Sequence, residues 1–211
     1  MARILIGSSN IYRFYEAAKF RQINPYVMVN CTRAELFKVK MAELGPEDKE
    51  VVISVIENFV CDAVKGVVDE MVAKGMYENV LKEFMGTVKE AAVRLPESRF
   101  ALAQPILRPG DNWYSANLET ILKDFIDGVN LIKQTNVMKL ETLSLTSQKF
   151  EYDGIHLTPE CGDTFVGITL EMAQAFFDAE LVDLEVGMEV EETSKGNIAG
   201  PSGTANKLLI A

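Results

Sequence analysis

Short runs of Val, Ile and Leu alternate along this chain with longer segments in which apolar residues recur every three or four positions. This alternation limits the fold more than any other feature. Strands that are buried on both faces of a parallel sheet are apolar throughout, and a helix joins each strand to the next. We therefore expect an α/β fold with a mostly parallel sheet flanked by helices, and five strands at residues 3–7, 26–30, 51–56, 99–103 and 137–143.

The segments between these runs have the apolar spacing of amphipathic helices. They are residues 10–22, 32–44, 60–93, 115–134 and 165–181. We expect the segment 60–93 to break near Gly75 into two helices, and to form an insertion that covers one end of the sheet. Residues 185–211 are acidic and rich in Gly, Ser and Thr. We therefore expect one domain over 1–184 and a tail or linker over 185–211.

Charge and composition exclude several classes of function. The formal net charge of -10 would repel nucleic acid phosphates and anionic membrane surfaces, and no basic patch interrupts it. The apolar runs are far shorter than the roughly 20 residues that cross a bilayer, so no integral membrane association is expected. No secretory signal is visible. Three widely spaced cysteines lack metal-binding spacing and suggest reduced thiols, hence an intracellular, cytoplasmic location.

The only histidine of the chain, His156, lies three residues after Asp153 and two before Thr158-Pro159. Thr158 followed by Pro159 is typical of a helix start, with Thr158 as the N-cap residue. A carboxylate one turn before a histidine can accept its Nδ1 proton, which fixes the tautomer and stabilises the imidazolium. We therefore interpret Asp153 and His156 as two members of a catalytic triad, with a structural or surface histidine as the alternative.

The nucleophile of such a triad is expected at the carboxyl end of a parallel strand, where working loops gather. The expected strand 3–7 leads into Gly7-Ser8-Ser9-Asn10 and then a helix. Ser9 at the helix start would offer a free backbone N–H to a developing oxyanion, and Asn58 after the third strand would offer its side-chain amide.

Each of these residues also has an alternative interpretation. Ser9 could be only a helix cap, and Asn58 could only close a turn. Ser8 is a competing hydroxyl. Cys31 invites a thiol-nucleophile reading, although free cysteines more commonly pack as small buried hydrophobic residues.

At these residues the sequence resembles the SGNH hydrolase family, also called GDSL esterases and lipases. Gly7-Ser8-Ser9 is similar to the family's Gly-Asp-Ser motif, Ile56-Glu57-Asn58 to its Asn block, and "DGIHLTPECG" to its final Asp-x-x-His block. The similarity in order and spacing covers roughly residues 3–180. The resemblance implies a three-layer α/β/α sandwich of the flavodoxin-like kind. It also implies a Ser-His-Asp mechanism that hydrolyses esters or thioesters with no metal or organic cofactor.

The chain departs from the family pattern at several positions. Ser8 replaces the usual Asp, and Glu57 and Phe59 flank Asn58 where other residues are common. The family's second block supplies a glycine N–H to the oxyanion hole, whereas Asn30 or Cys31 stands there. The backbone N–H of Cys31 can still donate, and loss of one such donor would cost on the order of 3 kcal/mol of transition-state stabilisation.

These observations predict a serine esterase that cleaves small-molecule acyl esters, acetyl or lipid, through an acyl-enzyme. Ser9, His156 and Asp153 are the expected catalytic residues, with Ser9, Asn58 and Cys31 around the oxyanion. The alternative is a weak or silent module used for binding or assembly, as part of a longer viral or mobile-element polypeptide. No phosphate-binding glycine motif is present, and the sequence does not indicate an oligomeric state. The expected pocket residues are Ser8, Asn10, Asn30, Arg108 and Trp113.

Overall fold

The computed structural model describes residues 2–16, 26–106, 113–140, 149–151 and 156–194. The chain divides into two compact units, Met1–Phe177 and Asp178–Ala211. The described strands are β1 (Ala2–Gly7), β2 (Val27–Asn30), β3 (Asp48–Ser54), β4 (Arg99–Ala103) and β5 (Val137–Leu140). The described helices are α1 (Ser9–Glu16), α2 (Ala34–Glu43), α3 (Ile56–Val64), α4 (Glu70–Arg94), α5 (Trp113–Ala116), α6 (Leu118–Asn130) and α7 (Pro159–Ser194).

Five of the described segments pair into one parallel sheet with the order β2-β1-β3-β4-β5. Its central register aligns Leu5 of β1 with Met28 of β2 on one side and with Val52 of β3 on the other. Strand order reverses at β1, because the chain adds β2 on one side of it and β3 to β5 on the other. In open parallel sheets, ligands bind outside the carboxyl ends of the strands at such a reversal.

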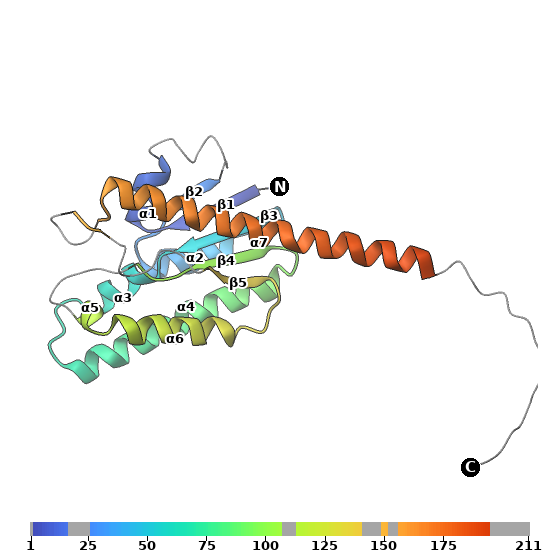
Figure 1. Cartoon of the computed structure of the whole chain (residues 1–211). Helices are drawn as coiled ribbons and strands as arrows, with labels where there is room; N and C mark the ends of the chain where they lie inside the picture. The colour runs from blue at the N-terminus through green and yellow to red at the C-terminus, as the bar shows by residue number, and fades with distance from the viewer. Residues whose placement is uncertain (1, 17–25, 107–112, 141–148, 152–155, 195–211) are drawn as a thin grey trace, which may run out of the picture. The chain divides into compact units, whose positions relative to one another are not determined.

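Helices cover both faces of the sheet, as Figure 1 shows. Side chains alternate along a strand, so Ile4 and Ile6 of β1 face one apolar core and Leu5 faces the other. The first core holds α2, α3, α4 and α6, and the second holds α1 and residues 159–177 of α7. The predicted α/β/α sandwich with a five-stranded parallel sheet is therefore confirmed.

Several predicted boundaries differ from the structure, among them those of the third strand and of the helical segment 60–93. Strand β3 spans Asp48–Ser54 and not 51–56, because Ile56 already belongs to α3. The helical segment breaks at Gly66, which has a φ of 75°, and α4 runs uninterrupted through Gly75. Asp69 caps the new helix by accepting a hydrogen bond from the Val72 N–H at 3.0 Å.

The long helix α4 belongs to the helical layer on one face of the sheet, where it packs with α2, α3 and α6 (Figure 1). At the other end of the chain, α7 continues to Ser194, so residues 185–194 of the expected tail are helical. Four of these ten residues are Glu, which favours helix. Within the residues described, no helix is long and apolar enough to cross a bilayer.

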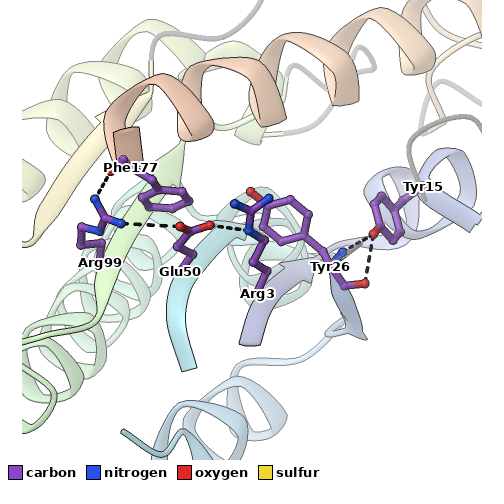
Figure 2. A network of polar contacts seen from close by, with 6 residues as sticks. All are labelled: Arg3, Tyr15, Tyr26, Glu50, Arg99 and Phe177. Carbon is purple, nitrogen blue, oxygen red and sulfur yellow. Dashed lines mark hydrogen bonds and ion pairs between the residues drawn. The ribbon is translucent and has the colours of Figure 1, made fainter. Parts of the chain in front are cut away.

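A buried ion network lies near the amino ends of the central strands, and Figure 2 shows its members. Glu50 of β3 pairs with Arg3 of β1 at 2.7 Å and with Arg99 of β4 at 3.5 Å. Arg99 also donates to the carbonyl of Phe177 in α7 and lies over the Phe177 ring. The network joins three adjacent strands to α7 at the sheet edge opposite Gly7 and Ser54, where β1 and β3 end.

Candidate active site

Ser8 and Ser9 lie where β1 passes into α1. The Ser8 N–H donates to the Ser54 carbonyl at 2.9 Å, and the Ser8 carbonyl accepts the Tyr12 N–H at 2.9 Å. Ser8 is thus the N-cap residue and Ser9 the first residue of the helix. Ser8 is fully buried, and its Oγ has no hydrogen-bond partner among the described residues, whereas Ser9 is partly exposed. Of the two hydroxyls, Ser9 is the accessible one.

A helix start leaves backbone N–H groups without intrahelical partners and carries the positive end of the helix dipole. Ser9 occupies such a position in α1. Asn58 lies in the first turn of α3, but its own N–H already donates to the Val55 carbonyl at 3.1 Å, so only its side-chain amide could serve as a donor there. The preceding strands pair through Gly7 and Ser54. The two helices therefore begin beyond the ends of adjacent strands, on opposite faces of the sheet, and the start of α1 is the one that suits the binding of a negatively charged oxygen.

Asn58 was predicted at a strand end and instead lies within a helix. It remains at the carboxyl edge of the sheet, since α3 begins two residues after β3 ends. Its side chain is 8% exposed, and the neighbouring Glu57 is fully buried.

His156 is half-buried and precedes α7, which begins at Pro159 as predicted. Two chain segments hold it in a narrow hairpin. The Glu151 N–H donates to the His156 carbonyl at 2.8 Å, and the Thr158 N–H donates to the Lys149 carbonyl at 3.0 Å. Asp153 lies in the intervening segment, outside the described residues.

One face of α1 contacts the histidine segment. The Leu157 N–H donates to the Asn10 Oδ1 at 2.9 Å, across 147 positions of sequence. Arg13 pairs with Glu151 at 3.0 Å. The ring of Phe14 lies so close to α7 that a Cβ added at Gly162 would be 2.0 Å from it. Asn10, Arg13 and Phe14 share a helix face because they are three and four residues apart.

The Asn10–Leu157 hydrogen bond also limits the distance between the candidate nucleophile and base. The donor belongs to the residue after His156, and the acceptor to the residue after Ser9. Standard bond lengths added to this contact keep the Cα atoms of Ser9 and His156 within about 13 Å. The structure thus brings these two predicted residues to one region of the molecule.

Cys31 follows the end of β2 and is fully buried. Its N–H donates to the Gly7 carbonyl at 2.9 Å, which extends the pairing of β1 with β2. The Cys31 N–H is therefore already used in strand pairing. It could act as the predicted oxyanion donor only if its hydrogen bond to Gly7 broke. Burial raises the pKa of the Cys31 thiol to about 11. The thiol is therefore protonated at neutral pH, which argues against the thiol-nucleophile alternative.

The remaining predicted pocket residues differ in position and exposure. Asn30 is exposed at the end of β2. Asn10 is fully buried, and its amide oxygen is used inside the protein by Leu157. Trp113 begins α5 and packs against Tyr77 of α4 with ring centroids 5.5 Å apart. Arg108 lies outside the described residues. No group of metal-binding side chains occurs in the part of the chain that the structure describes.

Asn10 was predicted to line a pocket, and its contact with Leu157 was not predicted. One signal was available. Asn is unfavourable within helices because its side chain competes for backbone hydrogen bonds, so an Asn directly after the first helical residue suggests a specific use of its amide.

Fold and site together define a three-layer α/β/α protein with a serine and a histidine segment at the carboxyl edge of its parallel sheet. No family model and no curated protein matches the sequence. Among solved structures, a candidate platelet activating factor from Streptococcus pneumonia has a TM-score of 0.56 and 12% identity over 81% of this chain and 83% of that chain. The lipase Lip_vut3 from a goat rumen metagenome has a TM-score of 0.57 and 10% identity over 82% of this chain and 97% of that chain. At such identities the similarity establishes the fold.

Proposed function

We propose that this protein is a serine hydrolase of the SGNH (GDSL) type that cleaves carboxylic esters. The observation that carries the proposal is the hydrogen bond from the Leu157 N–H to Asn10, because it joins the histidine segment to the helix that begins with Ser9. The accessibility of Ser9, in contrast to the burial of Ser8, supports the same assignment. The fold shared with a lipase is compatible with it.

In the proposed reaction, His156 takes the proton of the Ser9 hydroxyl while Ser9 Oγ bonds to the acyl carbon of the ester. The tetrahedral intermediate collapses, and the protonated histidine gives its proton to the leaving alcohol. Water then attacks the acyl-enzyme with His156 as general base, which releases the acid and restores Ser9. Asp153, three residues before His156, is the proposed acceptor of the Nδ1 proton.

The oxyanion of each tetrahedral intermediate needs hydrogen-bond donors. The Ser9 N–H at the start of α1 and the Asn58 side-chain amide at the start of α3 are the proposed donors. The family's third donor would correspond to the Cys31 region, whose N–H is held by Gly7. Absence of one donor would slow the reaction by about 3 kcal/mol of barrier and would not abolish it.

The substrate class follows from charge. A chain with a net charge of -10 repels anionic molecules at long range, so neutral acyl esters, with acetyl or lipid acyl groups, are the proposed substrates.

A second candidate is a nearly silent module that uses the same fold for binding or assembly. The observation that favours it is the engagement of the Cys31 N–H with the Gly7 carbonyl, which removes an expected oxyanion donor.

Covalent labelling separates the two candidates. Purified protein is incubated with a fluorophosphonate probe, the modified peptide is identified by mass spectrometry, and p-nitrophenyl acetate hydrolysis is measured in parallel. The serine hydrolase is expected to be labelled on Ser9, to lose label and turnover in Ser9→Ala, and to keep the label in Ser8→Ala. No label on wild type, or a label on Ser8, would refute the proposed mechanism, and absence of both label and turnover would favour the binding module.

A further inference from the structure

We propose that Asn10 is a positioning residue, whose side-chain carbonyl holds the peptide after His156 and thereby sets the direction of the imidazole toward Ser9. This role rests on the proposed function, in which His156 is the general base. It differs from the pocket role expected from the sequence, because the Asn10 side chain is fully buried.

The peptide between His156 and Leu157 is fixed on both sides. Its carbonyl accepts the Glu151 N–H at 2.8 Å, and its N–H donates to Asn10 Oδ1 at 2.9 Å. A planar peptide with both polar groups bonded has little freedom to rotate. The Cα of His156 is attached to this plane, so the point from which its side chain starts is fixed as well.

The partners of these two hydrogen bonds come from different parts of the fold. The Glu151 bond is local, because it belongs to the hairpin that contains His156. The Asn10 bond comes from α1, the helix whose first residue is Ser9. Asn10 therefore bonds the nucleophile helix directly to the histidine peptide, whereas the Arg13 and Phe14 contacts of α1 reach other residues of that region.

Because the hydrogen bond between the Leu157 N–H and Asn10 is buried, its loss should disturb the histidine segment. Asn10 and Leu157 are both fully buried, so loss of the acceptor leaves a backbone N–H without water to replace it. The segment would then shift to find another partner, and a shift of about 1 Å at a catalytic group can lower a rate by roughly a hundredfold. In the neighbouring Arg13–Glu151 pair the side chains are 45% and 26% exposed, and such partly exposed pairs contribute little.

Three variants separate positioning from general packing. Asn10→Leu keeps the number and branching of the side-chain heavy atoms and removes the acceptor, whereas Asn10→Asp keeps an acceptor oxygen and replaces the amide NH2. Arg13→Ala is the matched control, because it removes a partly exposed contact between the same helix and the same segment. Folding of each variant is checked by circular dichroism and thermal unfolding.

The kinetic readout is p-nitrophenyl acetate hydrolysis. Asn10→Leu is expected to lower kcat at least tenfold with KM within twofold of wild type. Asn10→Asp is expected to recover most of that loss, and Arg13→Ala to stay within twofold of wild type. A folded Asn10→Leu with wild-type kcat would overturn the proposal, and so would an equal loss in Arg13→Ala.

A second readout is independent of activity. His156 is the only histidine in the chain, so its imidazole ¹⁵N signals are assigned without ambiguity. Asn10→Leu is expected to move the tautomer ratio toward that of free imidazole, while Arg13→Ala keeps the wild-type ratio. An unchanged ratio in Asn10→Leu would overturn the positioning role even if wild type proves inactive. Lack of Ser9 labelling together with the expected change in ratio would instead refute only the hydrolase.

Discussion

The buried charge network near the amino ends of the strands gives a quantitative prediction about stability. Glu50 is 3% exposed and is the carboxylate that Arg3 and Arg99 share. The variant Glu50→Gln removes its charge while nearly preserving its volume. The Arg99 side chain is only 9% exposed, so its charge would remain buried without that partner. Removal of one member of a buried ion pair typically costs about 3–5 kcal/mol.

The lower end of that range applies here. Arg99 keeps its hydrogen bond to the Phe177 carbonyl and its position over the Phe177 ring, and Arg3 is 28% exposed and can gain hydration. We expect a loss of about 3 kcal/mol, which for a unit of this size lowers Tm by roughly 6–12 °C. Differential scanning calorimetry at neutral pH measures it.

The matched control is the ion pair made by Lys49, the residue before Glu50 in β3. Lys49 pairs with Glu97 at 2.7 Å, but Glu97 is 83% exposed. Because water replaces the lost contact of an exposed pair, Glu97→Gln should leave Tm unchanged within error. A fall of less than 2 °C in Glu50→Gln, or equal falls in both variants, would refute the reasoning that burial makes the Glu50 network important.

Two further predictions concern the site region. Burial raises the pKa of the Cys31 thiol to about 11, above its ordinary value of 9.0, so the folded state favours the neutral thiol. The neutral thiol should contribute its full stabilisation below pH 9. Between pH 9 and 11 the free energy of unfolding should therefore fall more in wild type than in Cys31→Ala, as measured by urea unfolding. Parallel pH curves for the two proteins would contradict this. Gly162→Ala should destabilise the protein by about 1–3 kcal/mol, because the new methyl group overlaps the Phe14 ring. The double variant with Phe14→Leu should cost less than the sum of the single variants, and strict additivity would contradict a direct clash.

The sheet was predictable from the sequence because its strands are short apolar runs between helical segments. Residues 99–103 are buried throughout, as expected of a central parallel strand. The end of β3 was misplaced because Val55 and Ile56 are also buried β-branched residues, and an apolar run reads the same in a buried strand and a buried helix start.

The helix break was misplaced for a different reason. Gly66 and Gly75 are both isolated glycines in a helical pattern, and only local capping distinguishes them. Asp69 followed by Glu70 is a helix-start signal, and it places the break at Gly66.

Part of the candidate site could also be inferred from sequence. Parallel topology places Ser9 and Asn58 at one edge, and Thr158-Pro159 marks the helix after His156. The contact of Asn10 with Leu157 could not be inferred, because it joins residues 147 positions apart and depends on the packing of α1 against α7. The engagement of the Cys31 N–H depends on how far the pairing of β1 with β2 extends, which side-chain patterns do not encode.

The most direct measurement is a crystal structure of the protein after reaction with a small fluorophosphonate. We expect a phosphonate bonded to Ser9 Oγ, with the His156 imidazole about 2.6–3.2 Å from the ester or serine oxygen. Continuous density at another residue, or an imidazole directed away from Ser9 in the adduct, would contradict the claim that these distant parts of the chain form one catalytic site.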